Sequence, residues 1–334
     1  MVTGAGGSIG GALSLRIADL HPRRLVLIDA SEQALHRLQS SLAGSGLREK
    51  ASIVLANVMD TMHLDEIFEA HRPQLIFHAA AYKHVPLLEE HPLEAIANNS
   101  LGTFRLTESA KKFGIRKVVL LSTDKAAAPI SVLGASKRIA EQITIANDGV
   151  ALRLANVLGT EGSVSETFLR QIDAGEPITL TDPSAERYFV TLEEAVDLLL
   201  ASATVPEGAA LLAPNLERQY RVAELAEYLV SFCLPGASLD FTVTGLRAGD
   251  KRREVLWSGE EQPCAADKNG YFAIKPAAIE HLFLRHKMDA LDSALRERDL
   301  AQAMEIVLQL VPDYAPSAGL LALIEKSSHR VTQR

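Results

Sequence analysis

Three reactive side chains stand next to one another near the middle of the chain, as Thr123-Asp124-Lys125. They follow an apolar run, Val118–Leu121, and should therefore lie at the end of a buried strand. A carboxylate beside an ammonium group can supply an acid and a base for proton transfer. The lysine can serve as the base only if burial or a cationic neighbour lowers its pKa towards neutrality. We therefore predict acid–base chemistry at this strand end.

A second lysine, Lys137, follows twelve residues after Lys125. It lies in Ser136–Asn147, where apolar residues recur at three- and four-residue spacing, so a helix is predicted there. We interpret Lys137 as the lysine that binds the ribose of a nicotinamide cofactor. A plain surface lysine is the alternative.

The chain begins with a glycine-rich loop of the spacing TGxxGxxG. Glycine permits a tight turn, a close approach of backbone N–H groups to a pyrophosphate, and tight helix packing. We predict a dinucleotide-binding loop, with a purely structural turn as the alternative. Its cofactor-binding residues are Gly4, Gly7, Ser8, Ile9 and Gly10.

Other candidate cofactor residues lie at the ends of the strands predicted to follow the glycine loop. Asp29 can bind a ribose 2′-hydroxyl, and because no arginine stands beside it, NAD is favoured over NADP. Asn57 and Val58 can hold the edge and face of the adenine, although a plain turn is equally compatible with them. Ala79 and Ala80 leave room for a flat cofactor.

Three basic residues are candidates for the substrate side. Lys83 stands at the rim beyond the alanines, and Arg187 and Arg247 can clamp a diphosphate through paired hydrogen bonds. Each could instead be a surface cation. The histidines of this region, His78, His84 and His91, lack ligand-like spacing, so no metal site is predicted.

The order of apolar runs predicts an α/β fold, a Rossmann-type doubly wound parallel sheet over residues 1–155. Only Met1 and Val2 precede the glycine loop, so the first strand is largely missing: the start is cut or assigned late, or the strand is very short. The other predicted strands are Arg24–Asp29, Ser52–Ala56, Leu75–Ala79, Lys117–Ser122 and Val150–Leu154, with a helix over Pro92–Phe113.

Residues 156–334 are expected to form a smaller α/β substrate lobe with C-terminal helices, not cleanly separable from the first part. Its predicted strands are Ile178–Leu180, Ala210–Ala213, Leu239–Val243 and Tyr271–Ile274. Helices are predicted over Leu192–Ala203, Val222–Ser231 and Met288–Leu310.

Composition excludes several classes of protein. The net charge of −8 and the pI near 5.7 argue against a nucleic-acid partner. The two cysteines, Cys233 and Cys264, lack CxxC spacing and are expected to be reduced core residues. No apolar stretch approaches the ~20 residues that span a bilayer, and no signal peptide is recognisable, so we expect a cytoplasmic chain.

Taken together, these segments resemble the extended short-chain dehydrogenase/reductases, and more narrowly the bacterial UDP-N-acetylglucosamine 4,6-dehydratases of polysaccharide biosynthesis. The matching stretches are VTGAGGSIG at 2–10, HAAAYKHVPLLE at 78–89, NNSLGT at 98–103, LSTDKA at 121–126, LGASKR at 133–138, NVLGTEGSV at 156–164, RYFVT at 187–191 and GLRAGDK at 245–251.

The resemblance implies NAD as cofactor, a UDP-sugar as substrate, and roles for the residues that match. Hydride leaves C4 of the sugar and returns at C6 after water has been lost. Asp124 would protonate the departing 6-hydroxyl, Lys125 would remove the C5 proton, and Thr123 would hydrogen-bond the sugar. The substrate-binding positions of the family align with Lys83, Asn156, Arg187 and Arg247. We also expect a homo-oligomer.

Some residues depart from the family pattern. Leu133 replaces the tyrosine of many relatives and the methionine of the larger membrane-anchored subgroup, so C4 oxidation needs Asp124, Lys125 or water as its base. Ala128 stands in place of an asparagine, and Ala213-Pro214-Asn215 in place of Asp-Met-Gly. The alternatives are therefore an NDP-sugar epimerase or reductase, and a weakly catalytic protein that binds NAD and a nucleotide sugar.

Overall fold

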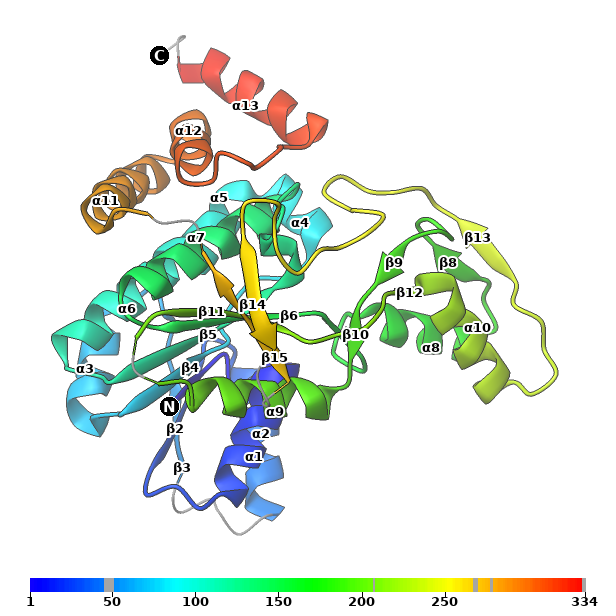
Figure 1. Cartoon of the computed structure of the whole chain (residues 1–334), viewed down its shortest axis with the longest axis horizontal. Helices are drawn as coiled ribbons and strands as arrows, with labels where there is room; N and C mark the ends of the chain where they lie inside the picture. The colour runs from blue at the N-terminus through cyan, green and yellow to red at the C-terminus, as the bar shows by residue number, and fades with distance from the viewer. Residues whose placement is uncertain (45–50, 207, 267–269, 277–278, 332–334) are drawn as a thin grey trace.

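A single large sheet organises the protein. The computed structural model describes residues 1–44, 51–206, 208–266, 270–276 and 279–331. Within them, nine strands form a sheet of order β14-β15-β11-β6-β5-β4-β1-β2-β3, parallel from β11 to β3. Helices lie on both faces (Figure 1). The predicted α/β, doubly wound Rossmann-type fold is confirmed.

The apolar runs of the first half became strands within one residue of the predicted ends. The strands are β2 Leu25–Asp29, β3 Ala51–Leu55, β4 Leu75–His78, β5 Lys117–Thr123 and β6 Val150–Leu154. The first strand, β1, consists of two residues, Val2–Thr3, and lies at the centre of the sheet. Val2 pairs with Leu27 on one side and Phe77 on the other.

Two predicted helices differ from the structure. The helix that carries Lys137 is α7, Val132–Ala146, and it begins four residues before the predicted start because the Ser131 side chain accepts a hydrogen bond from the Gly134 N–H. The predicted helix over Pro92–Phe113 is interrupted. It consists of α5 Pro92–Ala95, a π-helical turn η2 Ile96–Leu101 and α6 Gly102–Lys112.

The chain after β6 divides between the large sheet and a side lobe (Figure 1). The parts that join the sheet region are β7 Asn156–Val157, β10 Phe189–Val190, α9 Leu192–Ala203, β11 Ala210–Pro214, β14 Gln262–Ala266 and β15 Tyr271–Lys275. The lobe contains α8 Val164–Ala174, β8 Ile178–Leu180, β9 Glu186–Arg187, β12 Tyr220–Arg221, α10 Val222–Cys233 and β13 Phe241–Val243.

The C-terminal helices cover the face of the sheet that carries α6 and α7 (Figure 1). The helical region predicted over Met288–Leu310 is confirmed, and it is divided at Arg298, where a left-handed φ of 56° ends one helix before the next begins. The structure has α11 His281–Glu297, α12 Leu300–Leu310 and α13 Ala318–Val331.

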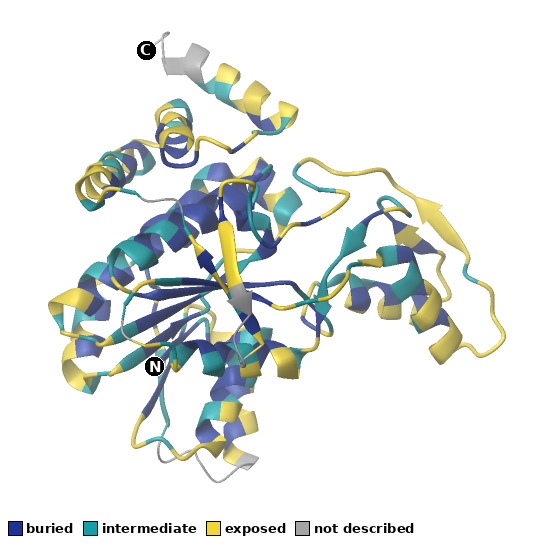
Figure 2. Ribbon diagram, viewed as in Figure 1, coloured by how far each residue is buried: buried dark blue, intermediate teal, exposed yellow. Residues whose placement is uncertain are grey.

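Both cysteines are exposed, which contradicts the prediction of core cysteines. Cys233 is the last residue of α10, and Cys264 lies on β14. Because β14 is the outermost strand of the sheet, it turns much of its surface to solvent, as Figure 2 shows.

A buried ion network ties α7, β6 and the segment before β14 together. Arg153 on β6 is 0% exposed, and its guanidinium lies 2.8 Å from Glu141 and 2.7 Å from Glu261. Burial alone would raise the pKa of Glu261, but the Arg153 guanidinium overcomes this and lowers it to about 2. Ser122 donates to Glu141, which links the network to the strand that ends at Thr123.

Removing the central cation of this network should be costly. Arg153→Leu leaves the buried carboxylates of Glu141 and Glu261 with Arg138 as their remaining cation. Two buried negative charges then share one positive charge, so the free energy of unfolding should fall by about 3–5 kcal/mol in urea titrations. The exposed Arg253–Glu186 pair provides the control, and Arg253→Gln should cost less than about 1 kcal/mol. Equal losses for both variants would contradict this account of the network.

Candidate active site

The glycine loop connects β1 to α1, Ser8–Asp19, and only glycine fits two of its positions. Gly4 has a φ of 68°, and a Cβ there would lie 2.5 Å from the Ala80 nitrogen. A Cβ on Gly10 would lie 2.0 Å from the Gly4 carbonyl oxygen. Gly7 is the N-cap of α1 and supplies no side-chain cap, so the unpaired N–H groups of the first helical turn are available to bind an anion.

Asp29 holds the loop to the end of β2. Its Oδ2 accepts from the Gly6 N–H and its Oδ1 from the Ser31 N–H, each at 2.9 Å. A carboxylate oxygen can accept more than one hydrogen bond, so both oxygens can still bind a ribose hydroxyl.

The other predicted cofactor residues surround the same edge of the sheet. The Gly4 backbone packs directly on Ala79 and Ala80 at the end of β4. Asn57 is exposed beyond β3, whereas the Val58 side chain is buried and faces Gly102 of α6. Parallel strands place their carboxyl ends together, which is why residues so far apart in sequence meet here.

Asp124 and Lys125 form an ion pair just after β5. Lys125 Nζ lies 3.0 Å from Asp124 Oδ1 and 3.2 Å from Asn156 Oδ1 on β7. Thr123 Oγ1 donates to Asp124 Oδ1 at 3.0 Å. The Asp124 side chain is 0% exposed, and its Oδ2 has no hydrogen-bond partner within the described parts of the chain. That oxygen is free to accept or carry a proton.

The charges around Lys125 favour its protonated form. Burial favours the neutral amine, but the Asp124 and Glu254 carboxylates outweigh burial and raise the pKa of Lys125. The condition that a lysine base requires, a lowered pKa, is therefore not met in this arrangement. The two carboxylates favour the ammonium form of Lys125.

Lys137 is the lysine whose pKa is lowered. Its Nζ donates to the Leu121 carbonyl at 2.6 Å, and burial lowers its pKa to about 8. Leu133, one turn earlier on α7, is 5% exposed and belongs to the hydrophobic core beneath the C-terminal helices. A leucine so placed contributes packing and no proton.

The predicted substrate-side cations lie on two sides of the site. Lys83 donates to the Glu161 carbonyl, and the Glu161 N–H donates to Ser8 of the glycine loop at 3.0 Å. Arg187 donates to the Lys251 carbonyl at 2.7 Å. Arg247 is exposed and pairs with Asp250 at 2.9 Å. Lys83 thus borders the glycine loop, whereas Arg187 contacts the segment that carries Arg247.

The sequence interpretation missed Glu254. Its side chain is buried, with Oε1 3.7 Å from Lys125 Nζ and Oε2 3.1 Å from Lys251 Nζ. In the sequence it follows two arginines and a lysine, a pattern typical of a solvated surface. No local signal distinguishes Glu254 from an exposed glutamate, because its burial comes from tertiary contacts.

His78 is a structural residue. Its ring nitrogens lie 2.7 Å from Thr3 Oγ1 and 3.0 Å from Thr103 Oγ1, and burial lowers its pKa to about 3, so it is neutral. Among the described residues, no group of three or more His, Cys, Asp or Glu side chains is arranged to hold a metal ion.

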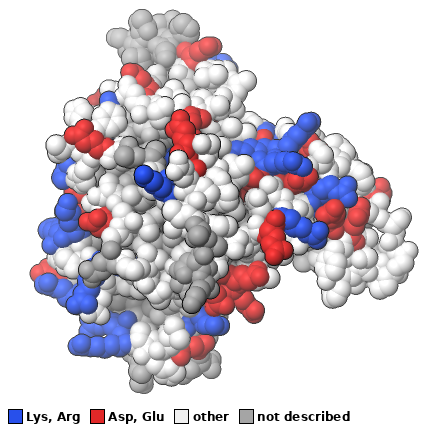
Figure 3. Space-filling model, in the orientation of Figure 1, with Lys and Arg blue, Asp and Glu red and all other residues white. Residues whose placement is uncertain are grey.

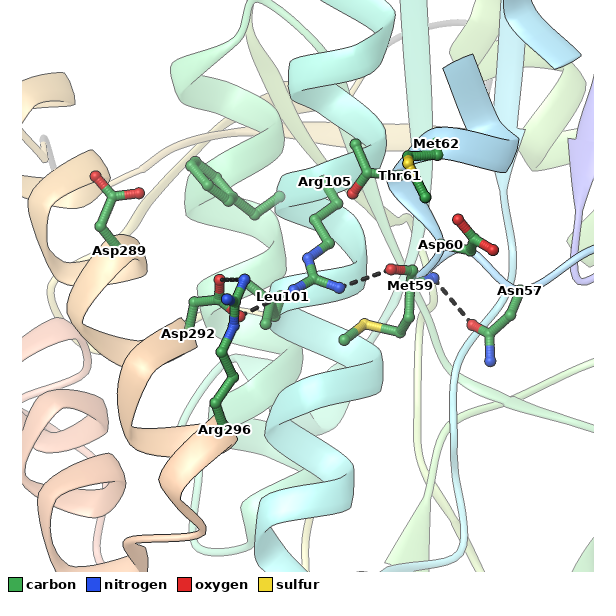
Figure 4. Close-up of a pocket in the computed structure, with 11 residues that line it drawn as sticks. Asn57, Met59, Asp60, Thr61, Met62, Leu101, Arg105, Asp289, Asp292 and Arg296 are labelled. Carbon is green, nitrogen blue, oxygen red and sulfur yellow. Dashed lines mark hydrogen bonds and ion pairs between the residues drawn. The ribbon is translucent and has the colours of Figure 1, made fainter. Parts of the chain in front are cut away.

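A cavity of about 660 Å³ adjoins the cofactor side of the site (Figure 4). It lies between the turn after β3, α6 and α11, and Arg105 crosses it to reach the Met59 carbonyl at 2.6 Å and Asp292 at 2.9 Å. Asn57 is part of its wall, whereas Asp124 and Lys125 are not. This cavity is therefore separate from the predicted chemistry.

On the face drawn in Figure 3, acidic and basic side chains are interspersed, and no large patch carries charge of a single sign. None of the helices in the described ranges has the length and apolar character needed to cross a membrane.

The fold and the glycine loop define a class, the short-chain dehydrogenase/reductases of extended type. Two solved structures show the likeness. Pen from Bacillus thuringiensis has a TM-score of 0.75 at 24% identity, over 85% of this chain and 95% of that one. DesIV from Streptomyces venezuelae, a dTDP-glucose 4,6-dehydratase with NAD and TYD bound, has a TM-score of 0.68 at 21% identity, over 78% and 88%.

The chain belongs to a narrower family, described as polysaccharide biosynthesis protein, whose sequence model matches residues 1–276. Capsular polysaccharide biosynthesis protein CapD of Staphylococcus aureus is 36% identical over 272 residues, which is 78% of this chain and 45% of CapD. The chain thus spans under half of that relative's length. UDP-glucose 4-epimerase of Rickettsia canadensis is 32% identical, over 82% of each chain.

The loop geometry predicts that substitution by alanine weakens NAD binding at Gly10 but not at the neighbouring Gly11. Gly10→Ala drives a methyl group into the Gly4 carbonyl, an overpacking that costs about 1–3 kcal/mol and displaces the loop. Calorimetric titration with NAD should show binding weakened by about 10–100-fold. Gly11→Ala is the matched control, because its Cβ would lie 3.4 Å from the Ala5 oxygen. It should bind NAD normally, and equal losses for both variants would contradict the role assigned to Gly10.

Proposed function

We propose that this protein is an NAD-dependent nucleoside-diphosphate-sugar 4,6-dehydratase acting on UDP-GlcNAc or a related UDP-amino sugar. The observation that carries this proposal is the Asp124–Lys125 ion pair just after β5, at the same carboxyl edge of the sheet as the glycine loop. An elimination needs both an acid for the leaving hydroxyl and a base for the adjacent C–H, and this pair offers both. The product would be a 4-keto-6-deoxy sugar for polysaccharide biosynthesis.

The cofactor half of the site fits NAD. Because Gly4 and Gly10 have no side chains, the backbone of the loop can lie close to a bound pyrophosphate. Asp29 is placed to bind the ribose 2′-hydroxyl. Lys137 would bind the nicotinamide ribose. When bound, NAD would take hydride from C4 of the sugar and give it back at C6.

Asp124 would first accept a proton from the substrate and later donate that proton back to it. Leu133 is buried and cannot accept a proton, so the base for the C4 hydroxyl must come from elsewhere. Asp124 Oδ2, which has no hydrogen-bond partner among the described residues, would accept this proton. Once protonated by the C4 hydroxyl, Asp124 is the acid that the departing 6-hydroxyl requires. Thr123, bonded to the other oxygen, would keep the carboxyl group in place.

Lys125 would then act at C5. While Asp124 is charged it helps to hold Lys125 as an ammonium ion. Protonation of Asp124 removes that negative charge, so the pKa of Lys125 falls at the stage when a base is needed. Asn156 would orient the amine, and Lys83, Arg187 and Arg247 would bind the substrate's diphosphate and sugar.

A second candidate is NDP-sugar 4-epimerase activity, favoured by the Rickettsia epimerase that matches 82% of each chain. A 4-epimerase needs no acid for a leaving hydroxyl, so the buried Asp124–Lys125 pair favours dehydration. Incubation with UDP-GlcNAc and NAD, followed by mass spectrometry for loss of water and proton NMR of the sugar for its configuration, separates the two. Loss of one water supports the dehydratase, whereas an epimer of unchanged mass overturns it.

Variants of Asp124 and Lys125 should be blocked at different steps of the reaction. Asp124→Asn should lower turnover by about 10²–10⁴-fold and prevent the absorbance of reduced nicotinamide from appearing with substrate. Lys125→Met should still reduce the cofactor but lose solvent-deuterium exchange at C5. Leu133→Ala is the packing control, and its product should be unchanged. Reduced cofactor accumulating in Asp124→Asn would show that Asp124 is not the C4 base.

Cofactor preference should depend on Asp29. The carboxylate repels a 2′-phosphate, so wild-type protein should bind NAD more tightly than NADP in calorimetric titrations. Asp29→Ala should narrow the difference, chiefly by weakening NAD. Tighter binding of NADP by the wild-type protein would refute this assignment.

A further inference from the structure

Glu254 is a buried carboxylate with two cationic neighbours. It is 2% exposed, and it stands between Lys125 at 3.7 Å and Lys251 at 3.1 Å. Burying a charge is costly unless it is compensated, and here two ammonium groups compensate the carboxylate. The question is what this carboxylate does for the site.

The side chain of Glu254 is not needed to hold its own segment. The segment is fixed through its backbone: the Glu186 N–H donates to the Arg252 carbonyl at 2.7 Å, Arg187 donates to the Lys251 carbonyl, and Gln219 donates to the Glu254 carbonyl at 3.0 Å. These bonds would survive if the carboxylate were replaced by an amide. The carboxylate is therefore available to act on Lys125.

Lys125 is surrounded by acceptors from three parts of the chain. Asp124 precedes it, Asn156 comes from β7, and Glu254 comes from the segment between β13 and β14. Two cations oppose them: Lys251 pairs with Glu254, and Arg187 on β9 is close enough to repel Lys125. Glu254 is thus the second carboxylate facing Lys125 and the one that does not take part in the proposed proton transfers.

We propose that Glu254 is a positioning residue that holds the Lys125 side chain in the site and, together with Asp124, favours its protonated form. In the reaction this inference rests on the proposed function: the Lys125 ammonium stays in place through C4 oxidation, and only then does the amine become available at C5. Lys251 limits the effect, because it partly neutralises Glu254. The protonation of Lys125 would therefore be set by a residue 129 positions away in the chain.

The test measures the protonation of Lys125 directly. Acetic anhydride reacts with amines and not with ammonium ions, and Lys125, with 23% of its side chain exposed, is accessible to it. The acetylation rate of the Lys125 peptide is followed by mass spectrometry between about pH 7.5 and 9.5, a range below the ordinary lysine pKa. Glu254→Gln removes the charge at constant shape, so the rate at a given pH should rise about tenfold, equivalent to one pKa unit.

Two further variants make the result decisive. Lys251→Met removes an opposing cation, so Lys125 should be acetylated more slowly, a direction that greater access to the site would not produce. Glu260→Gln, an exposed glutamate on the same segment, should leave the rate unchanged. Wild-type or slower acetylation in Glu254→Gln would overturn the proposal. If that variant fails to fold, faster or unchanged acetylation in Lys251→Met overturns it instead.

This experiment is independent of the proposed reaction. Acetylation needs no substrate, so a protein that removes no water from UDP-GlcNAc can still show the predicted shifts. In that case the dehydratase assignment fails and the Glu254–Lys125 coupling stands. Conversely, water loss by the wild-type protein with unshifted acetylation in Glu254→Gln rejects only the role of Glu254. In an active enzyme, Glu254→Gln should also move the pH dependence of kcat, and Glu254→Asp should restore it in part.

Discussion

The Lys125 ammonium is held by oxygen atoms from three separate parts of the chain, and this convergence depends on the architecture of the sheet. Asp124 follows β5, Asn156 begins β7 and Glu254 comes from the long connection before β14. A largely buried cation is tolerated only where such partners compensate it. The sheet edge, the side lobe and the connection between them must therefore be folded together before the site exists.

The cofactor side depends on steric constraint more than on charge. Gly4 and Gly10 lie so close to neighbouring backbone that no side chain fits, and Asp29 ties the loop to β2. Close backbone approach of this kind brings N–H groups to an anion without adding bulk. The central strand β1 has only two residues, yet it pairs on both sides and aligns the loop with the ends of β2 and β4.

The C-terminal helices lie outside the part of the chain that the family model matches. They nevertheless belong to the same hydrophobic core as α7, through buried residues such as Met288, Leu291 and Val307 together with Leu133. Leu133 therefore has a packing role at the position where many relatives have a hydroxyl. Packing from this side and the Arg153 network from the other fix α7, and with it Lys137.

The sequence alone determined the fold class, five strands to within one residue, the glycine loop, and the Asp124–Lys125 pair. These features are encoded locally, in apolar runs, glycine spacing and adjacent side chains. It did not determine the break between α11 and α12, the exposure of Cys233 and Cys264, or the extended start of α7. Tertiary structure alone decided the burial of Lys125 and the approach of Glu254, whose local sequence is typical of a surface and whose charge adds to that of the adjacent Asp124 in raising the pKa of Lys125. The local sequence indicates which chemistry a side chain is capable of. Its burial and its charge state depend on which distant residues the fold places beside it.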